Sequence, residues 1–196
     1  MSEKILEVPL KDKDIRDLNI GDVVYLKGMI YTARDMAHLR MKEFYENNSE
    51  YPVDFYGSVI FHAGPVAKKN GDSWDLIVIG PTTSVRMEPY SELVGELGVK
   101  AIVGKGGMLE KTIENAGKYG YVYLQAPPGC GVTTTEGFKE ISGVEWLDLA
   151  MPEALWKLDA VKFGPLVVSM DTHGKSIYKD IKENALKMVQ EKYKDN

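Results

Sequence analysis

Short apolar segments alternate along this chain with longer stretches in which apolar residues recur at helical spacing. The segment Leu76–Ile79 is apolar throughout, which is typical of a strand buried on both faces. Strands separated by helices favour an α/β domain whose central sheet is largely parallel and flanked by helices. In such sheets, ligands bind beyond the carboxyl ends of the strands. Six segments are predicted as strands: Asp22–Leu26, Val59–His62, Leu76–Ile79, Ala101–Val103, Tyr121–Gln125 and Leu166–Met170.

The first predicted helix begins at Thr32-Ala-Arg-Asp35, where Thr32 can cap the free backbone amides of the helix start. Three further helices are predicted over Pro89–Leu97, Met108–Tyr119 and Ile177–Lys194. Four residues form the predicted apolar stripe of the first helix: Met36, Leu39, Phe44 and Tyr45.

The 196 residues fit one domain, residues 1–196, and the 44% of hydrophobic residues can form a sizeable core. The net charge of −5 argues against broad nucleic-acid binding, because that requires a basic face. No apolar run approaches the roughly 20 residues that cross a membrane, and the charged start of the chain does not resemble a signal peptide. We therefore expect a cytoplasmic protein with neither a nucleic-acid nor a membrane partner.

Cys130 is the only cysteine, which excludes an internal disulfide within this chain. It also excludes an iron–sulfur or metal site built from cysteines of this chain alone, because such sites require about four thiolates. The sequence contains neither an H-E-x-x-H motif nor a cysteine–histidine spacing that would indicate another metal site. The sequence therefore predicts no metal ligands in this chain.

The segment Gly28–His38 brings Arg34 close to a predicted helix start, where the backbone amides carry partial positive charge. Arginine and helix-start amides together favour binding of a carboxylate or phosphate. His38 follows Arg34 by one helical turn and lies on a similar face. The alternative is that Arg34 pairs with Asp35 or another surface acid.

The segment Gly80–Met87 follows an apolar segment and places hydroxyl residues, including Thr82 and Thr83, after a Gly-Pro turn. Arg86 follows Thr82 by four residues, and hydroxyls with an arginine suit a small oxyanion. The alternative is ordinary turn capping, because serine and threonine favour turns for local reasons.

The segment Gly104–Gly107 lies between a predicted strand and a predicted helix. Its glycines let backbone amides approach a ligand, and Lys105 adds a positive charge. It is not a P-loop, because no G-x-x-x-x-G-K-[ST] motif is present. A plain turn with a solvated lysine is the alternative.

Taken together and in order, these motifs resemble the iron–sulfur-dependent class I fumarases. The resemblance is to their C-terminal domain, or to the separate β subunit of two-subunit fumarases and L-tartrate dehydratases, and it extends from about Val8 to Tyr178. The loop Pro127–Thr135 departs from the alanine-rich glycine loop of that family. Six segments carry the resemblance: Ile30–His38, Phe61–Pro65, Gly80–Met87, Gly104–Gly107, Glu153–Trp156 and Pro165–Asp171.

The resemblance implies a swivelling β/β/α-type domain and a hydro-lyase that reversibly dehydrates L-malate to fumarate. It implies that a separate α subunit holds the catalytic [4Fe-4S] cluster with three cysteines, so that this chain is active only with that partner. By motif, Thr82 corresponds to the proton-transfer residue. The resemblance assigns binding of the substrate carboxylates to three cations, Arg34, Arg86 and Lys105. It assigns a supporting role to Asp35, His38 and Thr83.

Three other functions remain open at this stage. L-tartrate dehydratase differs from fumarase by one extra hydroxyl on the substrate. A non-catalytic module that binds a dicarboxylate or serves in assembly would use the same cations without turnover. A nucleotide-binding α/β domain would use the Gly104–Gly107 turn, although no G-x-G-x-x-G follows the first predicted strand.

Overall fold

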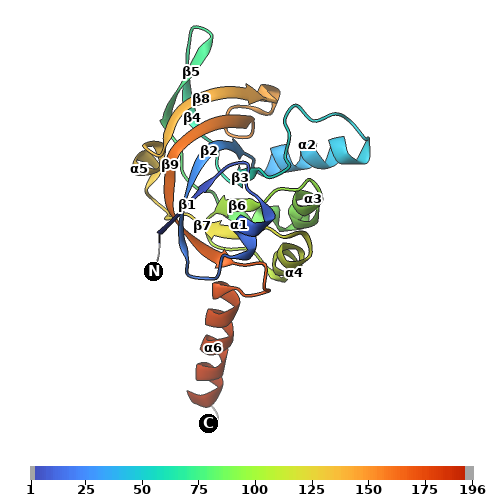
Figure 1. The fold of residues 1–196 in the computed structure, drawn as a ribbon, viewed down its shortest axis with the longest axis vertical. Helices are drawn as coiled ribbons and strands as arrows, with labels where there is room; N and C mark the ends of the chain where they lie inside the picture. Colours follow the sequence, from blue (N-terminus) through green and yellow to red (C-terminus); the bar gives the residue numbers. More distant parts are fainter. Residues whose placement is uncertain (1–2, 193–196) are drawn as a thin grey trace.

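The computed structural model describes residues 3–192, which form a curved mixed sheet with helices α2, α3 and α4 along one side (Figure 1). The strands are β1 (Glu3–Glu7), β2 (Val23–Thr32), β3 (Val59–Phe61), β4 (Val66–Asn70), β5 (Ser73–Val78), β6 (Ala101–Gly104), β7 (Val122–Gln125), β8 (Phe138–Glu145) and β9 (Leu155–Met170). The helices are α1 (Asp12–Arg16), α2 (Asp35–Glu46), the 3-10 helix η1 (Ser84–Tyr90), α3 (Ser91–Glu96), α4 (Glu110–Tyr119), α5 (Gly131–Thr135), the 3-10 helix η2 (Leu147–Leu149) and α6 (Ile177–Lys192).

Five of these strands pair in a closed ring. The order β2-β3-β6-β7-β9 is completed by a second pairing of β9 with β2, while β1 and β8 extend the sheet at its ends. The pairs β1–β2, β2–β3, β3–β6 and β6–β7 are parallel. All three pairings of β9 are antiparallel.

The expected α/β class is confirmed, but the expectation of a largely parallel sheet is wrong. Only the apolar end of β9, Leu166–Met170, was recognisable as a strand, whereas β9 runs for 16 residues. Its first half carries charged residues such as Lys157 and Asp159, so it does not show a continuous apolar run. That half is the antiparallel partner of β8, and β2 pairs antiparallel with both halves of β9.

The short parallel strands β3 and β6 are apolar throughout because both of their faces are covered. Val59 and Phe61 of β3 belong to the core cluster inside the ring, while Ile60 between them belongs to a second cluster. β6 repeats this alternation, with Val103 in the first cluster and Ile102 in the second. Successive side chains of a strand point to opposite faces, so alternate residues pack into the ring interior and against the helix layer.

The segment Leu76–Ile79 is an exception to this rule. It falls largely in β5, which pairs only with β4 in an antiparallel hairpin that projects at the top of Figure 1. Ile77 is 53% exposed, whereas Leu76 and Trp74 pack against the core. The expectation that this strand is buried on both faces is therefore wrong.

The predicted apolar stripe of α2 is also wrong. The helix buries another face instead, whose residues Ala37 and Met41 belong to the second core cluster together with Ile60 of β3. Exposed residues are Met36, Leu39 and Tyr45, and buried residues are Ala37, His38 and Met41.

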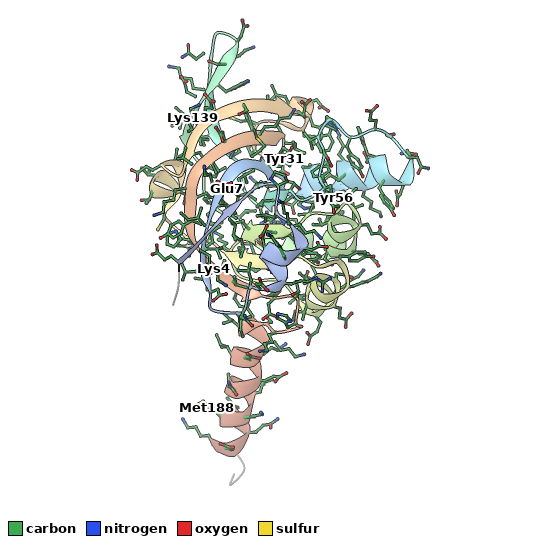
Figure 2. All side chains as sticks on the ribbon, in the orientation of Figure 1. Lys4, Glu7, Tyr31, Tyr56, Lys139 and Met188 are labelled. Atoms are coloured by element: carbon green, nitrogen blue, oxygen red, sulfur yellow. The ribbon has the colours of Figure 1, made fainter. Side chains whose placement is uncertain are left out.

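Helix α6 extends away from the body of the molecule, at the bottom of Figure 1. None of its residues is buried, and Met188, labelled in Figure 2, is 71% exposed. The helix predicted over Ile177–Lys194 is confirmed as far as Lys192, and residues 193–194 lie outside the described part of the chain. Within residues 3–192, no helix combines the length and the apolar character that crossing a membrane requires.

Candidate functional site

The candidate site lies at one edge of the parallel part of the ring. Arg34 follows the carboxyl end of β2, and Lys105 follows that of β6. Between these two strands lies β3, whose next residue, His62, accepts a hydrogen bond through its carbonyl oxygen from the backbone N–H of Thr82, at 2.7 Å. The three segments singled out by sequence therefore meet where ligands bind in parallel sheets.

Arg34 stands at the N-cap position of α2, with extended backbone. Glu153 supplies the side chain that caps this helix, because its Oε2 accepts a hydrogen bond from the Met36 N–H at 3.0 Å. The Arg34 Nε lies 3.2 Å from Glu153 Oε1, so the two side chains form an ion pair. The N–H does not point along that line, and Nε remains a buried donor without a hydrogen bond among residues 3–192.

The expected cap of α2, Thr32, has a different role. Its buried Oγ1 donates to the Ala154 carbonyl oxygen at 3.3 Å and accepts from the Trp156 N–H at 3.1 Å. Thr32 thus ties the end of β2 to the start of β9. Because Glu153 directly precedes Ala154, this contact also places the carboxylate that pairs with Arg34.

Arg86 and Asp35 form a two-pronged ion pair. The Arg86 Nε donates to Asp35 Oδ1 at 3.0 Å, and Nη2 donates to Oδ2 at 2.9 Å. This hydrogen-bonded pair lowers the pKa of Asp35 and raises the pKa of Arg86. The pairing of Arg34 with Asp35, raised as an alternative from the sequence, does not form, since the hydrogen-bond partner of Asp35 is Arg86 and Arg34 pairs with Glu153.

Thr82 joins the same network through its hydroxyl group. Arg86 Nη2 donates to Thr82 Oγ1 at 3.1 Å. Lys105 is attached through its backbone: its N–H donates to the Thr82 carbonyl oxygen at 3.3 Å, and Thr83 faces it in a parallel bridge. Among the described residues, the Lys105 ammonium group makes no hydrogen bond or ion pair.

Glu88 fixes the helix that carries Arg86. This carboxylate is only 9% exposed and caps the start of α4, where it accepts from the Leu109 N–H at 2.8 Å. It also accepts from the Thr112 N–H at 2.9 Å and from the Thr112 hydroxyl at 2.7 Å. Carboxylates at helix N-termini are favourable because they satisfy free amides and complement the helix dipole. η1 and α4 are thereby held together.

Two buried histidines lie beneath the cation cluster. His38 Nδ1 is 2.8 Å from the Arg34 carbonyl oxygen, and His62 Nδ1 is 2.9 Å from Ser84 Oγ. The Tyr123 hydroxyl donates to the same Ser84 oxygen at 3.0 Å. The two imidazole rings meet edge to face, with centroids 5.2 Å apart. Burial lowers the pKa of His38 to about 4 and holds the pKa of His62 well below its ordinary value.

Glycine is required in the Gly104–Gly107 turn for reasons other than phosphate binding. A Cβ on Gly104 would overlap Ser84 Oγ, and a Cβ on Gly107 would lie 2.6 Å from the Tyr178 ring. Gly106 and Gly107 also have φ angles of +77° and +74°, which favour glycine. Close packing and left-handed backbone account for this turn, which leaves the nucleotide-binding alternative without a specific feature.

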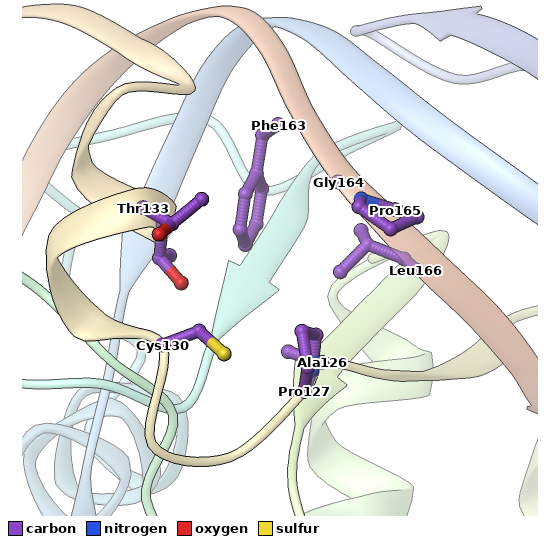
Figure 3. A pocket seen from close by; sticks show the side chains of 9 residues that line it. Ala126, Pro127, Cys130, Thr133, Phe163, Gly164, Pro165 and Leu166 are labelled. Atoms are coloured by element: carbon purple, nitrogen blue, oxygen red, sulfur yellow. The ribbon is translucent and has the colours of Figure 1, made fainter.

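A separate apolar crevice lies beside Cys130 (Figure 3). The loop that departs from the family pattern, Pro127–Thr135, forms one wall, and the β9 segment Phe163–Leu166 forms the other. The Cys130 thiol is exposed. This crevice shares no lining residue with the cation cluster. The loop adjoins the start of the Gly80–Met87 segment, because the Ile79 N–H donates to Thr135 Oγ1 at 3.0 Å.

Sequence reasoning selected the cations and Asp35 but gave no role to Glu153, the carboxylate that pairs with Arg34. Glu153 lies 119 residues from Arg34 along the chain, and no local pattern links the two. His62 and Ser84 lie within two of the selected segments, Phe61–Pro65 and Gly80–Met87, but the sequence gives neither residue a role.

A mixed α/β ring that gathers two arginine–carboxylate pairs, a lysine and a threonine hydroxyl at one strand edge defines a domain suited to a small anion. The family described as Fumarase C-terminus matches residues 2–181, and the chain belongs to that family.

Named relatives agree with this assignment. A protein of Methanocaldococcus jannaschii, provisionally named L(+)-tartrate dehydratase subunit beta, is 46% identical over 184 residues, or 93% of this chain and 94% of that protein. L(+)-tartrate dehydratase subunit beta of Escherichia coli strain K12 is 43% identical over 92% of this chain and 89% of its own. A Geobacillus stearothermophilus protein, provisionally named fumarate hydratase class I, is 39% identical over 94% of this chain and 35% of its own.

Proposed function

We propose that this chain is the β subunit of a hydro-lyase that reversibly dehydrates L-malate to fumarate, and that it acts only with an α subunit. The observation that carries the proposal is the continuous network in which Arg86 contacts both Asp35 and Thr82 beside Arg34 and Lys105. The names of the relatives support a hydro-lyase, and two of these names, L(+)-tartrate dehydratase subunit beta, support separate subunits. The family assignment supports the same reading.

Arg34, Arg86 and Lys105 bind the substrate carboxylates in this proposal. Two of the three positive charges are already balanced, by Glu153 and Asp35, so that the cluster as a whole retains one positive charge. Asp35 occupies Nε and Nη2 of Arg86, and substrate therefore approaches the remaining Nη1 donors. Arginine keeps its charge at neutral pH and binds carboxylates through paired donors, which suits it to this task.

Thr82 transfers the proton in this proposal. A threonine hydroxyl is a weak base, so a neighbouring group must take up its proton, and we assign that task to a carboxylate of the α subunit. The Arg86 guanidinium group, 3.1 Å from Thr82 Oγ1, stabilises negative charge that develops at this oxygen. Thr83 and His38 support the site, Thr83 through its bridge to Lys105.

The residues of this chain do not fit an iron–sulfur cluster. The sequence has one cysteine, whereas such clusters use about four thiolates, and Cys130 lies in the separate crevice. Within residues 3–192, no three histidine, cysteine or acidic side chains come together as metal ligands. We therefore place the [4Fe-4S] cluster on three cysteines of the α subunit and derive no step through it here.

The same proposal treats residues 1–196 as one domain of the swivelling β/β/α type, which moves as a unit against its partner. It places the complex in the cytoplasm, where a lone exposed thiol such as Cys130 stays reduced. No nucleic acid and no membrane belong to the proposed complex.

L-tartrate is the second candidate substrate. It is favoured by the higher identities, 46% and 43%, of the relatives named for tartrate dehydratase, against 39% for the relative named for fumarate hydratase. Tartrate carries one more hydroxyl than malate, which requires one more hydrogen-bonding group near the reacting carbons.

Reconstitution tests the proposal directly. The chain is purified alone, then mixed anaerobically with a cluster-bearing α subunit, and kcat/KM is measured for L-malate and L-tartrate. We expect no turnover by the chain alone and dehydration by the complex, with the larger kcat/KM identifying the substrate. Dehydration by the chain alone, or a complex inactive on both diacids, contradicts the proposal.

A further inference from the structure

Unpartnered buried polar atoms gather at the candidate site. Within residues 3–192, five buried side-chain nitrogen or oxygen atoms lack a hydrogen-bond partner. Three of the five are Arg34 Nε, His38 Nε2 and His62 Nε2. Leaving a buried polar group unpaired is costly, so a concentration of such atoms in one place requires an explanation.

The contact of His38 fixes its tautomer. Its Nδ1 lies 2.8 Å from the Arg34 carbonyl oxygen, which can only accept. Nδ1 must therefore carry a proton. Because burial keeps this imidazole neutral at pH 7, Nε2 holds a lone pair and is an acceptor.

The contacts of His62 fix the opposite tautomer. Ser84 Oγ accepts the hydroxyl proton of Tyr123, and His62 Nδ1 is the remaining partner of Ser84 Oγ among the described residues. The serine proton therefore points to Nδ1, which is an acceptor. In the neutral imidazole, Nε2 then carries the proton and is a donor.

The two unpartnered Nε2 atoms are thus complementary, one a donor and one an acceptor, on rings whose centroids are 5.2 Å apart. Both rings are held at their other nitrogens by the segments that carry Arg34 and Arg86. His62 also binds Thr82, through its carbonyl oxygen.

We propose that His62 and His38 are positioning residues with opposite fixed tautomers, which align the Arg34 end of α2 with the Thr82–Arg86 segment. Polar contacts join His38 to the Arg34 carbonyl oxygen, and they join His62 through Ser84 to Tyr123. The two imidazole rings meet edge to face between these two sets of contacts. The inference rests on the proposed function for its catalytic consequence, but the tautomers follow from the chain alone. The charges that face this pair are the Asp35 carboxylate beside His38 and the Arg86 guanidinium beside His62.

The tautomers are measured on the wild-type chain. The chain has three histidines, so 15N-histidine labelling and long-range 1H–15N correlation spectra resolve every imidazole. The exposed His173 is identified by its loss in His173→Gln. We expect the other two rings to remain neutral from pH 6 to 8, one protonated at Nδ1 and the other at Nε2. Two rings of the same tautomer, or a charged ring, overturn the proposal.

Activity of the reconstituted complex tests the positioning role. His62→Leu removes both ring nitrogens, whereas His62→Asn keeps an acceptor for Ser84. We expect His62→Leu to lower kcat/KM by roughly 10- to 100-fold, as loss of a supporting contact does, and His62→Asn to recover most of it. His173→Gln serves as the matched control and leaves kcat/KM unchanged.

Equal activity of His62→Leu and wild type, or equal loss in the two His62 variants, contradicts the positioning role. If His62→Leu does not fold, the spectra of the wild-type chain still decide the tautomers. A wild-type complex that acts on neither malate nor tartrate counts against the proposed function, and the spectra still decide the tautomers in that case.

Discussion

At the scale of single residues, Glu153 links helix geometry to the charge of the site. One of its oxygens caps α2 through the Met36 N–H, and the other pairs with Arg34. Its side chain is only 18% exposed, so the pairing is protected from solvent screening better than a surface ion pair. The same carboxylate therefore sets both the start of the helix and the position of Arg34.

We predict that Glu153→Gln lowers kcat/KM of the reconstituted complex by roughly 10-fold, because the amide keeps an acceptor for Met36 but loses the charge that holds Arg34. Steady-state kinetics measure this change, and a thermal melt shows that the fold is kept. Arg40→Gln, which breaks an ion pair with Asp148 elsewhere on α2, is the matched control. Equal kcat/KM in Glu153→Gln and the control would show that the ion pair does not position Arg34.

The buried histidines also predict how stability depends on pH. His38 has a pKa of about 4 in the folded chain against an ordinary value of 6.5. Between these two pH values, the imidazole is protonated in the unfolded chain and neutral in the folded chain. The free energy of unfolding should therefore decrease as the pH falls from about 6.5 towards 4. For one such group the decrease between pH 7 and pH 4.5 is roughly 2 kcal/mol.

We predict that His38→Gln loses less stability than wild type over this interval, since glutamine does not titrate. Urea unfolding at pH 7 and pH 4.5 gives the two differences, and His173→Gln controls for an exposed histidine. An equal decrease in wild type and His38→Gln would mean that His38 does not contribute to the acid sensitivity.

At the scale of elements, the junction between β2 and β9 determines where the site residues stand. Thr32 closes this junction with two hydrogen bonds from one buried hydroxyl. Thr32→Val keeps the shape but leaves the Trp156 N–H without an acceptor. We predict a loss of about 1–3 kcal/mol in the free energy of unfolding, measured by urea unfolding, together with a lower kcat/KM.

Thr135→Val is the matched control for this prediction. The Thr135 hydroxyl also donates to a carbonyl oxygen, that of Gly131, and accepts from the Ile79 N–H, but it lies in α5. The control should lose stability and keep its kcat/KM. Equal effects of the two variants on kcat/KM would show that the junction has no special connection to the site.

Local patterns predicted the elements that depend on local chemistry. The strands Val59–His62, Ala101–Val103 and Tyr121–Gln125 and the helix that ends at Tyr119 are confirmed, because buried parallel strands and glycine-terminated helices leave compact signals. The proximity of Arg34, Thr82 and Arg86 could also be predicted from the sequence, because each residue follows a strand or turn at the same edge of the sheet.

Features that depend on distant residues could not be predicted in this way. The first half of β9 alternates charged and apolar side chains, and only its partners β2 and β8 show it to be a strand. The pairing of Arg86 with Asp35 spans 51 residues, so the spacing suggested the wrong partner for Asp35. Leu76–Ile79 carried the pattern of a buried strand, but β5 lies outside the ring, where one face meets solvent.

At the scale of the whole molecule, the ring and its helix layer form the body, and α6 extends from it. The family match ends at residue 181, within this helix, and none of the residues in α6 is buried. We predict that removing residues 182–196 changes the melting temperature by less than about 3 °C and leaves kcat/KM unchanged, because none of the residues 182–192 is buried. A larger drop in melting temperature, measured by calorimetry, would show that α6 stabilises the body.

The proposed function requires that the cations of this chain bind the substrate in the assembled enzyme. The most direct measurement is kcat/KM of the reconstituted complex with Arg86→Ala, compared with Arg40→Ala as a control from an ion pair outside the site. We predict a loss of at least about 100-fold for Arg86→Ala, or roughly 3 kcal/mol of transition-state stabilisation, and little change for the control. Arg86→Ala activity close to that of wild type would contradict the account and leave this chain as an assembly module.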